Sequence, residues 1–261
     1  MKKILGLFIS VIMLSVMAIS LVGCGSENVL TVATNAEFPP FEYKDGRKIV
    51  GIDIAIAQEI ADDLGMKLKI VDMPFDSVVT SVQTGKADLA IAGLTITDDR
   101  KANIDFSNPY FDATQYIIVK DGDTTFNGLT TSEEVEEKIA GMSSPKIGVQ
   151  NGTTGYFYAK GNGDWFEGFA NADVKGYANG AMAVTDLING NLGMVIIDEL
   201  PALALVAENS GVKIIDIALT EEQYAVGIAK NRIGLVAAVN ATLERLIKDK
   251  KLDTIKAEYI K

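Results

Sequence analysis

Positions 89–100 carry the sequence LAIAGLTITDDR, and the order of residue types in it indicates the architecture of the chain. Residues 89–92 are apolar and predict a small buried strand, which Gly93 ends. The threonines that follow predict the start of a helix, with Arg100 one turn into it. Backbone N–H groups at such a start favour an anion, and an arginine can grip a carboxylate through two parallel hydrogen bonds. The segment therefore predicts an α/β domain with an anion site at the end of a strand.

The residues on either side of this segment alternate between strand and helix patterns. Upstream, the sequence predicts a strand at 29–34, a helix at 53–64, a strand at 67–73 and a helix at 75–83. Downstream, it predicts a helix near 131–139, a strand at 146–150, a helix from Thr153, a helix at 178–188, a strand at 193–198, a helix from Glu199 and a helical segment at 232–260. This alternation is typical of α/β domains with a largely parallel sheet.

Two apolar extended segments, 115–119 and 224–228, bracket the second set of elements. We interpret them as the two places where the chain crosses between two lobes. The first lobe is then discontinuous and comprises 29–114 and 225–261. The second lobe comprises 115–224 and has a hinge segment at each end, and the expected ligand cleft lies between the lobes.

Cys24 is the only cysteine of the chain, and it closes the tetrad Leu21-Val22-Gly23-Cys24. A basic start, an apolar segment and small residues before a cut site are typical of a secretory signal. The tetrad resembles the lipobox of bacterial lipoproteins, in which the cysteine is acylated. We therefore expect 1–23 to be a lipoprotein signal peptide, Cys24 to carry acyl chains such as palmitate, and 24–28 to be a lipid-anchored tether.

An uncleaved membrane helix is the alternative for this segment, because its apolar run is near the minimum spanning length. Three serines and Gly6 dilute the run, and the cysteine at its end favours the lipobox. Several acyl chains on one residue hold a domain firmly at a membrane, since each buried methylene contributes about 0.8 kcal/mol. The expected location is outside the cytoplasm, lipid-anchored to the cell membrane.

Charge and composition exclude several classes of function. Removing the first 23 of 261 residues leaves 238, and it leaves 22 of the 24 basic residues against 35 acidic ones, a net charge of −13. Such a surface disfavours nucleic acid and anionic lipid as partners. Histidine is absent, which removes Ser-His and Cys-His nucleophile pairs and the usual zinc sites. We expect no metal, no cofactor and no disulfide, because the acylated cysteine leaves no thiol.

Other predicted strand ends carry residues that complement Arg100. Phe38 and the carboxylate of Glu37 lie in a proline-rich loop after the first strand, and Asp198 lies at the end of a buried strand. An arginine fork and an aspartate that face each other across a cleft complement a zwitterion. The ligand carboxylate then binds Arg100, its ammonium binds Asp198, and aromatic residues such as Phe38 and Phe75 flank its side chain.

Each of these residues also has a purely structural interpretation. Arg100 can pair with a neighbouring surface aspartate, Asp198 can cap the helix that follows it, and Phe38 can belong to the core. The occurrence of all three at strand ends of an α/β sheet favours the ligand site.

Several motifs occur in a fixed order along the chain. They are Phe41-Glu42-Tyr43, Gly51-Ile52-Asp53-Ile54, Leu94-Thr95-Ile96-Thr97-Asp98-Asp99-Arg100, Ile104-Asp105-Phe106-Ser107, Gly148-Val149-Gln150-Asn151-Gly152-Thr153-Thr154 and Tyr224-Ala225-Val226-Gly227-Ile228-Ala229. With these motifs the chain resembles the bacterial extracellular solute-binding proteins of family 3, the amino-acid receptors of uptake ABC transporters. The similarity runs from about Leu30 to the C-terminus. Ala55 departs from the family signature, which has an acidic residue there, and we expect this to affect packing or surface charge.

This resemblance implies a two-lobed α/β fold of the periplasmic-binding-protein type II class, whose hinge closes on the ligand. The ligand-binding residues that it implies are Asn35, Phe38, Phe75, Gly93, Thr95, Arg100, Gln150, Thr153, Thr154 and Asp198. Arg100 is implied to hold the α-carboxylate together with backbone N–H groups of Thr95 and of Thr153 or Thr154. Asp198 and the Gly93 carbonyl are implied to hold the α-ammonium.

The resemblance leaves the side chain of the ligand open. Phe38 and Phe75 are implied to enclose it, while Asn35 and Gln150 face its tip. Their neutral amides suit a polar, uncharged tip such as that of glutamine. Glu37 next to Phe38 offers a negative charge, and flat aromatic walls suit a guanidinium, although a loop glutamate commonly points to solvent. The sequence therefore favours a polar or basic amino acid.

An enzyme is the alternative, because the same fold includes dehydratases that act on cyclohexadienyl amino acids such as arogenate. An enzyme needs a group poised for proton transfer beside its substrate. The carboxylates expected in the cleft are Asp198, already assigned to the ammonium, and Glu37. We therefore expect a monomeric binding protein without catalytic residues, which captures a free amino acid and delivers it to the permease of an ABC importer.

Overall fold

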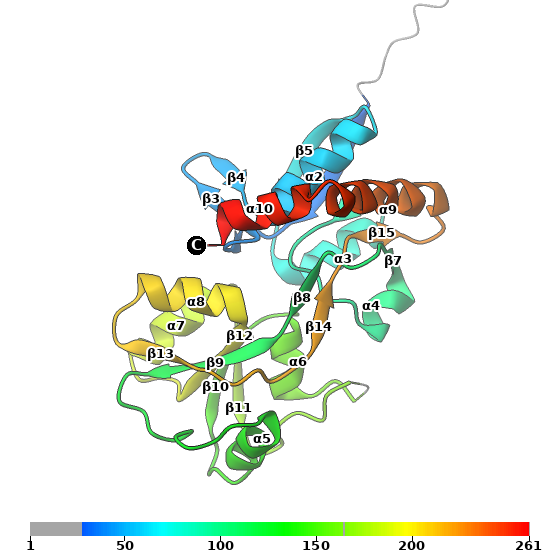
Figure 1. The fold of residues 1–261 in the computed structure, drawn as a ribbon. Coiled ribbons are helices and arrows are strands. Elements are labelled where there is room, and N and C mark those ends of the chain that lie inside the picture. The colour runs from blue at the N-terminus through cyan, green and yellow to red at the C-terminus, as the bar shows by residue number, and fades with distance from the viewer. Residues whose placement is uncertain (1–27, 164, 261) are drawn as a thin grey trace, which may run out of the picture.

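The computed structural model describes residues 28–163 and 165–260. The predictions for the signal peptide 1–23, for Cys24 and for most of the tether therefore lie outside the described residues. Within the described part the chain forms two lobes, each built around a five-stranded sheet with helices packed against it (Figure 1). No helix of this part is long and apolar enough to cross a membrane.

The first lobe combines the N-terminal elements with the C-terminal helices (Figure 1). Its strands are β1 (Val29–Thr34), β5 (Lys67–Asp72), β6 (Leu89–Ala90), β7 (Ile104–Phe106) and β15 (Gly227–Ala229), with a small sheet of β2 (Glu37–Phe38), β3 (Glu42–Asp45) and β4 (Lys48–Val50). Its helices are α2 (Ile52–Asp63), α3 (Phe75–Gln83), α4 (Asp98–Asn103), α9 (Ile233–Lys248) and α10 (Lys251–Tyr259). The main sheet has the order β5-β1-β6-β15-β7, in which β1 is parallel to β5 and β6, and β15 is antiparallel to its two neighbours.

The second lobe repeats this plan with the middle of the chain. Its strands are β9 (Gln115–Lys120), β10 (Lys146–Gln150), β11 (Asp173–Tyr177), β12 (Met194–Asp198) and β13 (Val212–Ile215). Its helices are α5 (Ser132–Ala140), α6 (Thr154–Lys160), α7 (Gly180–Ile188) and α8 (Glu199–Glu208). The sheet order is β11-β10-β12-β9-β13, with β10 parallel to β11 and β12. The α/β class and the two-lobed arrangement are as predicted.

Apolar spacing explains how the helices of the first lobe pack. Ile52, Ile56 and Ile60 recur every fourth residue of α2 and are fully buried. The predicted helical segment at 232–260 is two helices, because Lys250 adopts the left-handed conformation with φ 56°. Both of these helices contact α2, so the C-terminal end of the chain completes the core of the first lobe.

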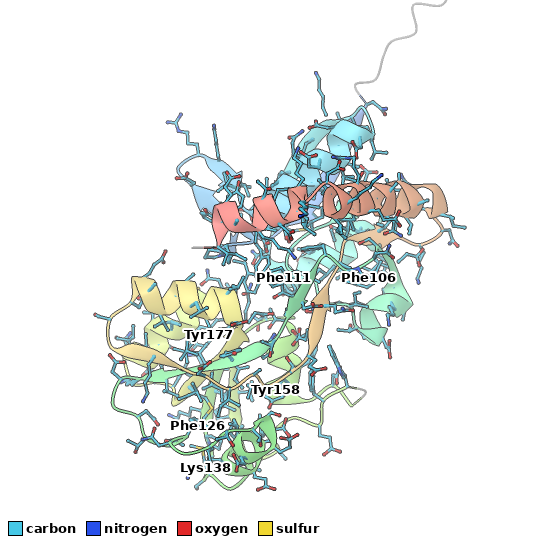
Figure 2. The ribbon with its side chains drawn as sticks, in the orientation of Figure 1. Phe106, Phe111, Phe126, Lys138, Tyr158 and Tyr177 are labelled. Atoms are coloured by element: carbon cyan, nitrogen blue, oxygen red, sulfur yellow. The ribbon has the colours of Figure 1, made fainter. Side chains whose placement is uncertain are left out.

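The described residues form three clusters of buried apolar side chains. The largest cluster continues from the first lobe into the second and includes Tyr224 and Ile197. A separate cluster fills the second lobe around β9, β10 and β12, and Phe126 and Tyr158 belong to it (Figure 2). Among the described residues, all members of these clusters lie at or after Leu30, and a chain that begins at Asn28 contains them.

The hinge is a two-stranded antiparallel sheet of β8 (Phe111–Ala113) and β14 (Glu222–Tyr224). β8 connects β7 of the first lobe to β9 of the second, and β14 connects β13 to β15, so the chain crosses between the lobes here twice (Figure 1). The two predicted crossings need correction. Segment 115–119 belongs to β9, and segment 224–228 runs from the end of β14 into β15. A buried central strand is a continuous apolar run, and the sequence alone does not distinguish it from an apolar crossing segment.

Candidate ligand-binding site

Eight of the ten residues predicted to bind the ligand line one small pocket between the lobes. The lining residues are Phe38, Phe75, Gly93, Thr95 and Arg100 of the first lobe and Thr153, Thr154 and Asp198 of the second. The pocket has a cavity volume of about 10 Å³, far below the about 300–1,000 Å³ of pockets that hold drug-sized ligands, so the closed lobes leave little free space there. A wall built from both lobes means that the pocket is complete only while the lobes are closed.

Strand ends bring these residues together. Gly93 follows β6, Gln150 ends β10 and Asp198 ends β12. The carboxyl ends of parallel strands meet at one edge of a sheet, which is where ligands of open α/β sheets lie. The pocket therefore lies where the two sheets turn these edges toward each other.

Arg100 is buried, and its guanidinium joins the lobes. Nη1 donates to the carbonyl oxygen of Thr95 at 2.7 Å in the first lobe. Nη2 donates to the carbonyl oxygen of Gly152 at 3.0 Å in the second lobe. The guanidinium carbon lies 5.4 Å from the centre of the Phe75 ring, within the range of a cation–π interaction.

Charge remains on Arg100 despite its burial. Burial lowers the pKa of Arg100 to about 10, and the negative charges of Glu222 and Asp198 act in the opposite direction. The guanidinium is therefore protonated at neutral pH, and it gives the pocket a cation whose hydrogen bonds go to uncharged carbonyl groups. Such a group suits the carboxylate of a ligand.

Asp198 is the acid of the pocket. It is 4% exposed and accepts a hydrogen bond from the hydroxyl of Tyr224, a residue of β14. Burial and the charge of Glu222 together raise the pKa of Asp198 to about 7, although the hydrogen bond from Tyr224 acts in the opposite direction. A cationic group of a ligand beside this carboxyl would favour its ionised form.

These residues also make contacts that bear on their purely structural interpretations. Among the described residues, Asp98 pairs with Lys101 and not with Arg100. Asp198 stands at the N-cap position of α8, yet its side chain makes no capping hydrogen bond. Phe38 has both roles, because it belongs to the core and also lines the pocket.

Asn35 and Gln150 do not line the pocket, but they meet across the cleft. The Nε2 atom of Gln150 donates to Oδ1 of Asn35 at 2.9 Å, and Nδ2 of Asn35 donates to the carbonyl of Met73 at 3.0 Å. Both amides are buried. Within the described part of the chain, Oε1 of Gln150 has no hydrogen-bond partner.

Glu37 faces a different hollow from the one predicted for it. It is exposed and lines a groove between the lobes, together with Lys44 of the first lobe and Leu203 and Glu208 of the second. The structure thus places this carboxylate outside the pocket of Arg100 and Asp198.

A pair of buried acids supports Gly93 from behind. Both Glu42 and Asp53 are fully buried. Asp53 accepts a hydrogen bond from the backbone N–H of Gly93 at 2.7 Å and one from the hydroxyl of Tyr110 at 2.8 Å. Neither carboxyl oxygen of Glu42 has a partner among the residues described. Asp53 thereby fixes the strand end whose carbonyl is expected to bind the ligand ammonium.

Sequence analysis missed Glu222, a buried acid of the hinge that accepts hydrogen bonds from Thr95 and Thr154. It lies in a short polar run, which is typical of an exposed loop. The alternation of buried Glu222, exposed Gln223 and buried Tyr224 is a strand pattern, but three residues are too few to recognise it. Among the described residues no group of three or more His, Cys, Asp or Glu side chains could hold a metal ion.

Comparison with known proteins gives this geometry a family context. The model of the bacterial extracellular solute-binding proteins, family 3, matches residues 30–261. A probable histidine-binding protein of Neisseria gonorrhoeae is 30% identical over 236 residues, which are 88% of this chain and 82% of the relative.

Solved structures share the fold at similar identity. The substrate-binding protein AbpA of an amino acid ABC transporter of Streptococcus pneumoniae, solved with bound L-arginine, is 34% identical with a TM-score of 0.78, over 89% of this chain and 94% of that one. The ancestral amino acid-binding protein AncCDT-1, a precursor of cyclohexadienyl dehydratase, is 30% identical with a TM-score of 0.78, over 90% of this chain and 96% of that one.

Because of the buried acids Glu42 and Asp53, we expect the free energy of unfolding to depend on pH, and we expect Glu42→Gln to reduce this dependence. Burial raises the pKa of Asp53 to about 6 and raises that of Glu42 well above its ordinary value, with the charge of Asp53 adding to the latter. Between its ordinary pKa and its raised pKa, each carboxyl binds more protons in the folded state than in the unfolded state. The free energy of unfolding therefore falls as pH rises through about 6 for Asp53, and the fall continues to higher pH for Glu42. Urea unfolding at pH values from 4.5 to 8 gives the free energy of unfolding, which should change less with pH in Glu42→Gln than in the parent. Glu37→Gln, at an exposed position, serves as the control, and parallel profiles for Glu42→Gln and the parent would contradict the prediction.

Proposed function

The chain belongs to the bacterial extracellular solute-binding proteins of family 3, and from this membership we propose that it captures a free amino acid outside the cytoplasm for an ABC importer. One observation carries the proposal: a buried guanidinium and a buried carboxyl line the same small pocket. Arg100 binds the α-carboxylate, with backbone N–H groups of Thr95 and of Thr153 or Thr154. Asp198 and the Gly93 carbonyl bind the α-ammonium.

The amide pair at the cleft limits the side chain of the ligand. A backbone carbonyl only accepts hydrogen bonds, so the contact with Met73 fixes which end of the Asn35 amide carries the nitrogen. Oδ1 of Asn35 then faces Gln150, and Nε2 of Gln150 has to donate to it. Oε1 of Gln150 remains an acceptor without a partner among the described residues. A side chain that reaches this atom must donate, which favours an amide, ammonium or guanidinium group over a carboxylate.

Ligand binding and lobe closure are coupled in this proposal. Hydrogen bonds that join the lobes at the site include those from Gln150 to Asn35, from Arg100 to the Gly152 carbonyl, and from Tyr224 to Asp198. A ligand that contacts both lobes adds to these bonds only in the closed form. It therefore shifts an open–closed equilibrium toward the form that the permease receives.

The cellular setting completes the proposal. Cys24, when acylated, tethers the protein to the outer face of the cell membrane, and the protein acts there as a monomer. Relatives named as binding proteins for histidine and arginine support transport as the role.

We assign the chain to binding and not to catalysis. The lining residues include two ionisable groups, those of Arg100 and Asp198, and both are assigned to the charges of the ligand. No further lining group is left to move a proton to or from a bound substrate. The similarity to a dehydratase precursor keeps a cyclohexadienyl dehydratase as the alternative.

A thermal-shift screen tests the proposed ligand class. The chain from Asn28 onward is unfolded and refolded to remove any co-purified ligand and is then screened with the twenty amino acids and cystine. Ligand at 100 times its dissociation constant adds about 2.7 kcal/mol of stability. Arginine, lysine, histidine or glutamine should raise the melting temperature, and glutamate and aspartate should not. Absence of any shift, together with turnover of arogenate or prephenate, would favour the dehydratase.

Replacement of Arg100 by alanine should nearly abolish binding of the amino acid that the screen selects. The buried carboxylate of the ligand would lose its partner, which costs about 3–5 kcal/mol, or at least a hundredfold in affinity. Isothermal titration calorimetry measures the change, with Lys101→Ala at the neighbouring exposed position as control. Binding of the Arg100→Ala variant within tenfold of the parent would refute this assignment.

Affinity should depend on pH through Asp198. With a pKa of about 7 in the ligand-free pocket, its carboxyl must lose a proton before it pairs with the ammonium. Arg100, Glu222, Tyr224 and Glu42 are the charged or titratable neighbours that influence this equilibrium. Affinity should be constant above about pH 7 and fall by up to about tenfold per pH unit below it. Calorimetry from pH 5.5 to 8 in two buffers also measures the released proton, and a flat profile for the parent would disprove the coupling.

A further inference from the structure

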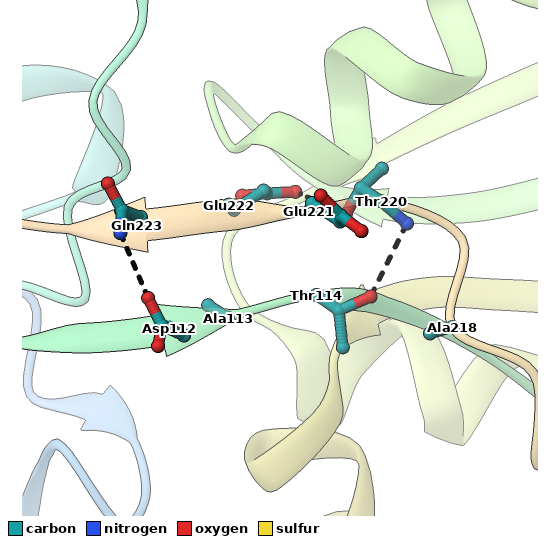
Figure 3. Close-up of a pocket in the computed structure, with 8 residues that line it drawn as sticks. All are labelled: Asp112, Ala113, Thr114, Ala218, Thr220, Glu221, Glu222 and Gln223. Atoms are coloured by element: carbon teal, nitrogen blue, oxygen red, sulfur yellow. Dashed lines mark hydrogen bonds between the residues drawn. The ribbon is translucent and has the colours of Figure 1, made fainter.

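Glu222 occupies an unusual position in the hinge. It lies at the start of β14 and is 4% exposed. Figure 3 shows β8 and β14 side by side, joined by a hydrogen bond from Gln223 to Asp112. Just beyond the strands, the backbone N–H of Thr220 donates a second hydrogen bond to Thr114. Glu222 borders the open hollow behind these strands, and it does not line the ligand pocket. Its carboxylate therefore stands between the outer face of the hinge and the site.

Protein groups occupy all the acceptor positions of this carboxylate. Oε1 accepts hydrogen bonds from Nε2 of Gln115 at 3.1 Å and from Oγ1 of Thr220 at 2.8 Å. Oε2 accepts from Oγ1 of Thr95 at 2.8 Å and from Oγ1 of Thr154 at 2.7 Å. A carboxylate offers about four such positions, so Glu222 has none left for a ligand.

The two donors to Oε2 come from different lobes. Thr95 follows β6 in the first lobe and forms a β-bridge with Tyr224, so it remains beside β14 when the lobes move. Thr154 is the first residue of α6 in the second lobe. The hydrogen bond from Thr154 forms only when α6 stands against the hinge strand, and opening of the lobes breaks it. Both threonines line the ligand pocket.

Loss of this bond in the open form leaves a carboxylate at the hinge with an empty acceptor position. A hydrogen bond to a charged group makes a net favourable contribution even when water can replace it, so the bond favours the closed form. It also fixes the residues at positions 95 and 154, whose backbone N–H groups are proposed to bind the α-carboxylate. Glu222 thus acts on the site through two threonines.

We propose that Glu222 is a positioning residue that holds the lobes closed through Thr95 and Thr154 and so sets how long the ligand stays bound. It touches no ligand itself. The effect on ligand release rests on the proposed function, whereas the effect on closure is measured without any ligand.

A distance measurement in the ligand-free protein tests the proposal. Spin labels are attached at Lys44→Cys and Glu208→Cys, on opposite sides of the groove between the lobes, in the chain from Asn28 onward, which lacks Cys24. Glu222→Gln should raise the ratio of open to closed molecules by about tenfold, as expected for a lost hydrogen bond to a charged group. Glu221→Gln is the matched control, because it removes the same charge from the exposed neighbouring residue. Its distances should equal those of the parent.

Two further measurements keep the result independent of any folding defect in one variant. Thr154→Val removes the other partner of the inter-lobe bond, so it should shift the distances like Glu222→Gln, and the double variant should shift them little further. Stopped-flow kinetics with L-arginine should show a dissociation rate about tenfold faster in Glu222→Gln, with little change in the association rate.

Unchanged distances in both Glu222→Gln and Thr154→Val would overturn the proposal, as would an equal shift in Glu221→Gln. Failure of the parent to bind any amino acid would refute the proposed function instead. The distances in the ligand-free protein would still decide the role of Glu222.

Discussion

The closed structure depends on the burial of the Arg100 guanidinium between the two lobes. Removal of a charge from water is costly unless partners replace the solvent. The carbonyl oxygens of Thr95 and Gly152 supply hydrogen bonds, one from each lobe, but no opposite charge. The acids Asp198 and Glu222 supply that charge from nearby and act against the lowering of the Arg100 pKa by burial. The site is therefore an arrangement of one cation and two acids that only a closed pair of lobes can assemble.

Glycine at position 93 links this charge arrangement to the fold. Its φ is 51°, and a Cβ atom there would lie 3.0 Å from the ring of Phe38. A side chain at this position would be strained and would displace the aromatic wall of the pocket. Asp53 holds the backbone N–H of the same residue, with Glu42 buried close by. One backbone position thus sets both the wall and the direction of the carbonyl group proposed to bind the ligand ammonium.

Local sequence patterns predicted the structural features that depend on neighbouring residues, and they missed the features that depend on residues far apart in the chain. β1 and α3 have the predicted bounds, because β-branched runs and helical spacing are local signals. Arg100 and Asp198 could be proposed from their places at strand ends. The three-residue hinge strands were too short to show a period. Glu222 is recognised as a buried acid of the site only from its hydrogen bonds to Thr95 and Thr154, which lie 127 and 68 residues away along the chain.

The charges in the site bear on the ligand as strongly as its hydrogen bonds do. The zwitterionic backbone of a bound amino acid adds no net charge to the one cation and two acids of the site. The charge of the ligand side chain therefore determines the net charge of the occupied site. A basic side chain offsets the second acid, whereas an acidic one adds a third negative charge to a region with little water, at a high cost. The free acceptor on Gln150 leads to the same preference by an independent route.

The two acids still have separate tasks, because Asp198 lines the pocket where a ligand ammonium can reach it, while all four acceptor positions of Glu222 are filled by the protein. A second acid placed behind the pocket can thus contribute charge to the ligand without competing for its hydrogen bonds.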